Sequence, residues 1–264
     1  MSAFAQLVPQ LVLVLSILAV IQIATFARML LAIRATPAPR PQFTPYNEAD
    51  DWMPAERRAE IAEQVAALAL EGFTVVMDVF WESARRRLII MVNDTTAEFA
   101  ALVTNTFSGG RVAVTLSITG EFADGRELSV DDSALGTGLP GVPQLTRWQL
   151  PLAHPPARLL RAFRYILGRD FPGQRLTIRD PDLSIEERTR RSMVRETTHW
   201  IAAGYYAIDP RTNTPFPTWR SALCMVIHAA FPFGPINRRR IRRQAEGLLT
   251  EAESVPWDHH RVSV

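Results

Sequence analysis

The longest pattern in the chain is an uninterrupted apolar segment at its N-terminus. No charged side chain occurs from Met1 to Ala27, and 15 residues between Leu7 and Leu31 are Leu, Val, Ile or Phe. About 20 apolar residues cross the hydrocarbon core of a bilayer, and at roughly −0.3 to −0.6 kcal/mol per residue the favourable insertion energy is about −5 to −9 kcal/mol. The pattern therefore predicts a transmembrane anchor in residues 1–34.

The charges around this anchor predict its orientation. No basic residue precedes the apolar run, which is longer than the core of a cleaved signal peptide, so we expect an uncleaved signal-anchor. Arg28, Arg34 and Arg40 follow the run. Because basic residues collect on the cytoplasmic side, we expect the N-terminus outside, the remaining chain in the cytoplasm, and the anchor in the inner (cytoplasmic) membrane of the cell.

A Pro-rich stretch and then a helical period follow the anchor. Residues 35–49 contain four prolines and few side chains able to pack, which predicts a stiff, extended linker. From residue 54 to residue 70, Ile61, Val65 and Leu68 recur at spacings of four and three, and Gly72 is placed to end the helix. This segment is predicted to be an amphipathic helix that opens the folded domain.

The period then shortens to that of β-strands. Residues 73–81, 88–92, 98–107, 112–122 and 126–130 are short runs rich in β-branched and aromatic residues. The pairs Gly109–Gly110 and Asp124–Gly125 mark turns between the later runs. Short links of this kind favour an antiparallel meander. Residues 133–151, where Gly and Pro are frequent, are predicted to be a long surface loop.

Two further helices complete the predicted domain. Residues 155–167 have a helical apolar period, with Gly168 at the end. Ser184 and Glu187 have the spacing of a capping box, which opens a helix to about residue 203. The fold class predicted for residues 50–220 is α+β, with a mainly antiparallel sheet flanked by helices.

The last segment, residues 221–264, joins an apolar stretch to a basic helix. Residues 222–233 are apolar except for His228, and at about 12 residues they are too short to span a bilayer. A buried core helix, a re-entrant piece and an interfacial helix all remain open. Five arginines follow, each worth about 1 kcal/mol near an anionic leaflet, so membrane-surface binding competes with a solvated basic helix: Arg238, Arg239, Arg240, Arg242 and Arg243.

The charge composition excludes several chemistries. All 29 basic residues are arginines, so a phosphate-binding loop lysine, a kinase strand lysine and Schiff-base catalysis are excluded. The single cysteine, Cys224, excludes an intrachain disulfide and a Cys-rich metal site. Residues 1–150 carry 11 Arg and 16 acids, whereas residues 151–264 carry 18 Arg and 11 acids. The basic half favours an anionic partner, and the anchor favours lipid headgroups over nucleic acid.

Few residues are candidates for chemistry or binding. The five histidines lack metal-ligand spacing, and no metal site, cofactor or catalytic motif is predicted. Asp131 and Asp132 after a strand could form an acidic pair, although such pairs usually mark a solvated turn. Tyr205, Tyr206 and Trp219 fit either an interfacial aromatic belt or a core.

The order of these motifs resembles that of a group of uncharacterised bacterial single-pass membrane proteins. An N-terminal anchor is followed by a strand ending at residues 122–125, then by residues 204–206, and then by residues 217–219 with an apolar stretch and an arginine run. The resemblance implies the architecture and brings no activity or site residue with it.

Two functional hypotheses follow from the sequence. The leading one is a membrane-anchored cytoplasmic binding or scaffolding module that holds a protein partner near the bilayer. The alternative is a membrane-associated hydrolase or lipid-modifying enzyme whose site is assembled from Asp131, Asp132 and His154. An enzyme requires these side chains to converge in a pocket.

Overall fold

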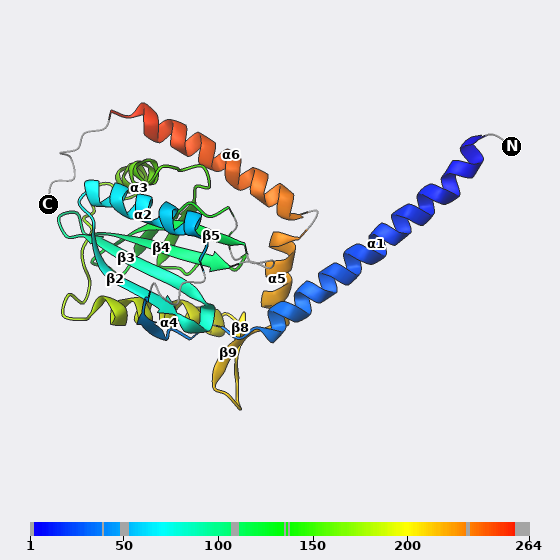
Figure 1. Ribbon diagram of the computed structural model, residues 1–264, viewed down its shortest axis with the longest axis horizontal. Helices are drawn as coiled ribbons and strands as arrows, with labels where there is room; N and C mark the ends of the chain where they lie inside the picture. Colours follow the sequence, from blue (N-terminus) through cyan, green and yellow to red (C-terminus); the bar gives the residue numbers. More distant parts are fainter. Residues whose placement is uncertain are drawn as a thin grey trace. The chain divides into compact units, whose positions relative to one another are not determined.

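The protein is represented by a computed structural model, which describes residues 3–38, 40–47, 53–106, 111–134, 136, 138–230 and 233–256 (Figure 1). Its contacts divide the chain into two compact units. The anchor unit comprises Met1–Ala38, Thr137–Leu139 and Trp200–Pro235. The sheet unit comprises Pro39–Gly136, Pro140–His199 and Ile236–Val264.

The sheet unit is built on a seven-stranded sheet whose strands lie in sequence order. Each neighbouring pair is antiparallel except β6 and β7, which are parallel. This confirms the predicted α+β class with a mainly antiparallel sheet. The strands are β1 (Phe43–Pro45), β2 (Thr74–Trp81), β3 (Arg86–Asn93), β4 (Glu98–Thr106), β5 (Val112–Glu121), β6 (Glu127–Asp131) and β7 (Leu145–Gln149).

Helices cover both faces of this sheet (Figure 1). α2 (Ala55–Leu70), α3 (Pro156–Asp170) and the C-terminal part of α6 (Phe233–Ser254) enclose the main core with one face. α4 (Ile185–Ala202) packs on the other face, against a smaller cluster around Leu88 and Ile90. Successive residues of β3 alternate between the two clusters, as the two-residue period of a strand requires. The sheet is therefore apolar on both faces and closed by its own helices.

The predicted helical faces are confirmed in detail. Ile61 and Leu68 of α2 are buried, and the predicted apolar positions of α3 lie in the main core or against it. Ser184 accepts a hydrogen bond from the Glu187 backbone N–H at 3.2 Å, as a helix cap does. The Asp124–Gly125 turn is present, with Gly125 at a φ of +91°, whereas the Gly109–Gly110 turn lies outside the described residues.

Two predictions about this unit were wrong. Residues 133–151 are not all loop, because residues 145–149 form β7 beside β6. The helix α3 also continues past Gly168 to Asp170, because a glycine lowers helix stability without ending a helix that is held by packing. The predicted linker contains β1, which pairs with the end of β2, and a short 3₁₀ helix (Glu82–Ala84) joins β2 to β3.

The anchor unit contains an apolar helix, a hairpin and a short helix. These are α1 (Ala3–Ala35), β8 (Tyr206–Asp209) with β9 (Thr214–Pro217), and α5 (Trp219–Ala229). Within α1, residues Val12–Ala35 have a mean hydropathy of 2.1 and none of the tested window is buried, so this helix is long and apolar enough to cross a bilayer. Gly138, at a φ of +70°, lies so close to α5 that a Cβ would come within 2.5 Å of His228 Cβ.

Candidate functional site

The exit of the apolar helix α1 is held by one arginine. Arg34 Nη1 donates a hydrogen bond to the carbonyl oxygen of Pro217. The same guanidinium lies 4.9 Å from the ring centroid of Phe216 and 5.1 Å from that of Trp219. Charge-assisted hydrogen bonds and cation–π contacts are among the stronger polar interactions of proteins. Arg34 therefore ties α1 to the hairpin and to the first residue of α5.

The helix α5 has one buried and one exposed apolar side. Ser221, Ala222 and Val226 are buried. Trp219, Leu223 and Ile227 are 57%, 43% and 40% exposed. Because residues at spacings of four lie above one another on a helix, these three form a continuous exposed row, called here the apolar stripe. The predicted apolar segment is thus an amphipathic helix, in contact with α1 in the anchor unit.

The three aromatic residues predicted for an interfacial belt all lie in the anchor unit but have different surroundings. Trp219 belongs to the apolar stripe. The ring of Tyr205 lies 4.3 Å below the Arg220 guanidinium, and Tyr206 stacks on Trp200 with ring centroids 5.7 Å apart. Both tyrosines are half-buried. Packing accounts for the tyrosines, whereas Trp219 presents most of its surface outward.

The five C-terminal arginines occupy the N-terminal half of α6, and all five are exposed. In the part of the chain that the structure describes, only Arg242 pairs with a carboxylate, that of Glu246 at 3.2 Å. The first turn of α6 contains no acidic residue. Several of these arginines are three or four residues apart, and like charges at these spacings on a helix repel, so an anionic partner would relieve the repulsion. The cluster is a candidate binding surface on these grounds.

The acidic pair and the predicted histidine are partly brought together. Asp132 Oδ2 lies 3.5 Å from His154 Nε2, and Asp132 Oδ1 accepts the Leu116 backbone N–H at 2.9 Å. Asp131 instead accepts from Arg147 Nε at 2.9 Å and from Ser133. In the described part of the chain, Asp132 is the only ion-pair or hydrogen-bond partner of His154. The arrangement orients an imidazole, and no hydroxyl or thiol of the described residues is hydrogen-bonded to it.

Burial raises the pKa of the Asp132 carboxyl to about 6, against the opposing effects of the Leu116 N–H and of His154. The pKa of this carboxyl is higher in the folded protein than in the unfolded chain. The free energy of unfolding therefore falls as the pH rises from about 4, the unfolded pKa, to about 6, the folded pKa. We expect Asp132→Asn to stabilise the full chain at pH 7.5 by up to about 3 kcal/mol, and to have no such effect at pH 4. Thermal unfolding at the two pH values measures this. A stabilisation equal at both would contradict the assignment.

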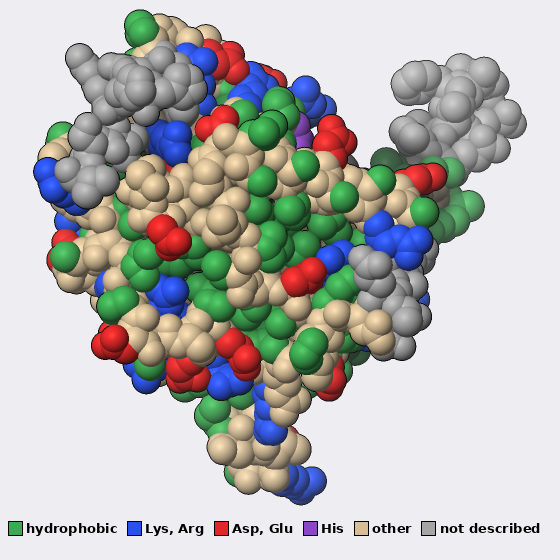
Figure 2. All heavy atoms as spheres, turned by 60° about the vertical axis from the view of Figure 1, so that its left-hand side comes forward, with side chains coloured by type: hydrophobic (Ala, Val, Ile, Leu, Met, Phe, Trp, Pro, Cys, Tyr) green, Lys and Arg blue, Asp and Glu red, His purple; other side chains and the backbone are tan. Residues whose placement is uncertain are grey.

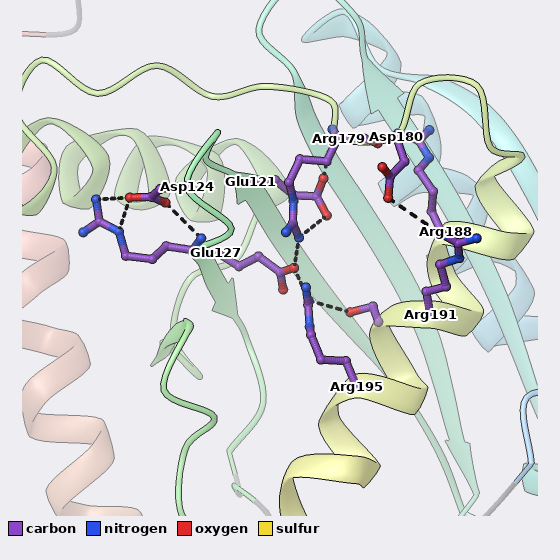
Figure 3. A network of polar contacts seen from close by, with 10 residues as sticks. Glu121, Asp124, Glu127, Arg179, Asp180, Arg188, Arg191 and Arg195 are labelled. Atoms are coloured by element: carbon purple, nitrogen blue, oxygen red, sulfur yellow. Dashed lines mark hydrogen bonds and ion pairs between the residues drawn. The ribbon is translucent and has the colours of Figure 1, made fainter.

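A buried ionic network that the sequence does not indicate joins the sheet to α4 (Figure 3). Arg179 Nη2 lies 2.7 Å from Glu127 Oε1 and 3.2 Å from Glu121 Oε1. Arg195 of α4 also pairs with Glu127, whose side chain is only 8% exposed. Partners more than 50 residues apart leave no local signal. The buried carboxylate is satisfied from two sides, which gives this network a structural role.

Acidic and basic side chains are intermixed on the face of the sheet unit shown in Figure 2. Over the residues that the structure describes, no group of three or more His, Cys, Asp or Glu side chains is arranged to hold a metal ion. Comparison with protein-family models, curated proteins and solved structures gives no match to this chain. The features of this protein that bear on its function are therefore the side chains described above in each of the two units.

Proposed function

We propose that this protein is a membrane-anchored cytoplasmic binding or scaffolding module. The anchor unit seats it on the bilayer, and the sheet unit presents a surface for a protein partner. The observation that carries the proposal is the apolar stripe of α5, which belongs to the same compact unit as the membrane helix α1. If α1 crosses the bilayer, the apolar stripe lies in the same unit as a membrane helix, and its side chains can enter the boundary between headgroups and acyl chains.

The exposure of the apolar side chains of α1 supports this attachment to the bilayer. The described apolar side chains from Val12 to Ile23 are exposed, and the bilayer is the solvent in which such exposure carries no penalty. Arg34 fixes α5 at the end of that helix, where acyl chains give way to headgroups. The arginines of α6, of which only Arg242 has a carboxylate partner among the described residues, begin nine residues after Ala229, the last residue of α5, and suit anionic headgroups.

Spin labels in the full chain test whether α5 contacts lipid. In a Cys224→Ser background reconstituted into liposomes, a label on Leu223→Cys is expected to be more accessible to oxygen than to a water-soluble nickel chelate. A label on Arg211→Cys, an exposed position in the hairpin turn of the same unit, is expected to show the reverse. Equal chelate accessibility at the two positions would exclude contact between α5 and the bilayer.

The orientation has its own test. Arg28, Arg34 and Arg40 follow the apolar segment, and the positive-inside rule places them in the cytoplasm. A C-terminal epitope tag on the full chain is expected to resist protease added to spheroplasts, in which the outer membrane is already opened, and to be digested after the inner membrane is opened as well. Digestion in intact spheroplasts would place the sheet unit outside and remove the cytoplasmic part of the proposal.

A further inference from the structure

The two edges of the sheet differ in how they are protected. At one edge, β1 has only three residues and ends in Pro45, features that discourage pairing with another strand. At the other edge, β7 has five residues without proline and, among the strands of the described residues, pairs only with β6. In the described part of the chain, no backbone hydrogen bond joins residues 146–149 to anything outside that pair. The edge of β7 is therefore available to an additional strand.

A groove runs along this available edge. Residues 146–150 form one side of an open hollow of about 330 Å³, and Ile241 and Gln244 of α6 form the other. Extended peptides add to a sheet at an exposed strand edge, because the strand supplies backbone hydrogen bonds and neighbouring side chains, here Ile241 and Gln244 of α6, supply further contacts. The hollow has the size of a small binding site.

Of two arginines beside the groove, one has a carboxylate partner and the other has none among the described residues. The charge of Arg147 on β7 is engaged by Asp131. Arg240 precedes Gln244 by one helical turn, so it lies about 40° from that wall residue around α6. Arg240 is exposed and has no carboxylate partner in the described part of the chain. Among the described residues, Arg240 therefore supplies an uncompensated positive charge beside the helical wall of the groove.

We propose that the groove between β7 and α6 binds an extended acidic peptide segment of the partner protein, which adds a strand to β7. The inference rests on the proposed function, since it names the chemistry of the partner that the sheet unit holds. Backbone hydrogen bonds along β7 fix the register of the peptide, and an Asp or Glu side chain of the peptide pairs with Arg240.

The chain contains a matched control for Arg240. Arg239 is the adjacent residue, is equally exposed, and likewise has no carboxylate partner in the described part of the chain. It lies about 160° around the helix from Ile241, so its side chain leaves the opposite side of α6. Arg240→Gln and Arg239→Gln therefore remove the same charge, one beside the groove and one away from it.

The test uses the full chain in nanodiscs of phosphatidylcholine, a neutral lipid, so that anionic headgroups do not compete. A displayed library of peptides of about ten residues, the upper length of common strands, is selected on these nanodiscs. The most enriched peptide is then labelled and titrated by fluorescence anisotropy. We expect enriched sequences to carry Asp or Glu among β-branched residues, and Arg240→Gln to weaken binding about tenfold while Arg239→Gln changes it less than about twofold.

A second peptide separates strand addition from simple charge attraction. Methylation of alternate backbone nitrogens along one edge removes donors and leaves the charge unchanged, so it is expected to abolish binding when applied to the edge facing β7. Equal losses of affinity in the two arginine variants, or unchanged binding of the methylated peptide, would each overturn the proposal. A library selection that enriches no peptide would overturn it as well. The spin-label result at Leu223 does not depend on peptide binding. A failure of the peptide test therefore leaves the proposed contact of α5 with the bilayer unaffected, and a failure of the spin-label test leaves the peptide proposal unaffected.

Discussion

Arg164→Met is expected to destabilise the protein by about 3–5 kcal/mol, because it leaves a charged carboxylate in the core without its partner. Glu98 is fully buried at the start of β4, on the sheet face covered by α3. Arg164 of α3 binds both of its oxygens, Nε to Oε1 at 2.8 Å and Nη2 to Oε2 at 2.7 Å. Thr96 donates the remaining side-chain hydrogen bond at 2.8 Å. Urea unfolding of the full chain in nanodiscs measures the loss.

The matched control removes both charges. Glu98→Gln combined with Arg164→Met leaves no buried ion, and we expect it to recover at least half of the stability lost in the single variant. Arg161 of the same helix serves as the surface comparison, because its guanidinium binds backbone carbonyls near the C-terminal end of α6. A loss below about 1 kcal/mol in Arg164→Met would contradict the importance of this buried ion pair for stability.

The secondary structure that local patterns determine was predictable from the sequence. The helical period of residues 54–70 is created by side chains that must share one face. Of these side chains, Ile61 and Leu68 are buried in α2, and Val65 is half-buried against the main core. The strand runs are likewise recognisable, because alternate residues enter opposite cores. In both cases a few consecutive residues contain the whole signal.

The strand β7 was not predictable in this way. Its residues, Leu145–Gln149, follow a stretch rich in Gly and Pro, and their extended conformation is stabilised by parallel pairing with β6. A parallel pair needs a long connection, so no short turn marks it in the sequence. The groove proposed for peptide binding depends on this strand together with residues nearly a hundred positions later in α6. The groove between β7 and α6 could therefore not be predicted, because it depends on pairing between residues far apart in the sequence.

The candidate membrane surface was predictable in part. The apolar segment, Trp219 and the arginine run were all identified from composition, whereas the apolar stripe required knowledge of which side of α5 is buried. Of the three residues of the alternative enzyme hypothesis, Asp132 and His154 lie close together, whereas Asp131, the last residue of β6, pairs with Arg147. The sequence does not indicate that these two adjacent aspartates have different partners.

Arg34→Ala is expected to release the hairpin and α5 from α1, at a cost of about 2.5–5 kcal/mol. One charge-assisted hydrogen bond is worth roughly 1.5–3 kcal/mol and each cation–π contact about 0.5–1 kcal/mol or more, and Arg34 makes one of the former and two of the latter. The backbone bond from Ala38 N–H to the Pro215 carbonyl, 2.8 Å long, does not replace them. Hydrogen exchange of the full chain in nanodiscs should show amides of β8, β9 and α5 exchanging about 30-fold faster or more.

Arg28→Ala is the control, since Arg28 is an exposed arginine on the same helix, without a hydrogen bond or ion pair in the described part of the chain. Both variants remove one positive charge from the end of the apolar helix α1, so any effect on membrane orientation is shared. Faster exchange confined to Arg34→Ala would show that this arginine couples α1 to the rest of the anchor unit. Equal exchange in the two variants would mean that α5 is held by the bilayer or by apolar packing alone, and that Arg34 contributes only its charge.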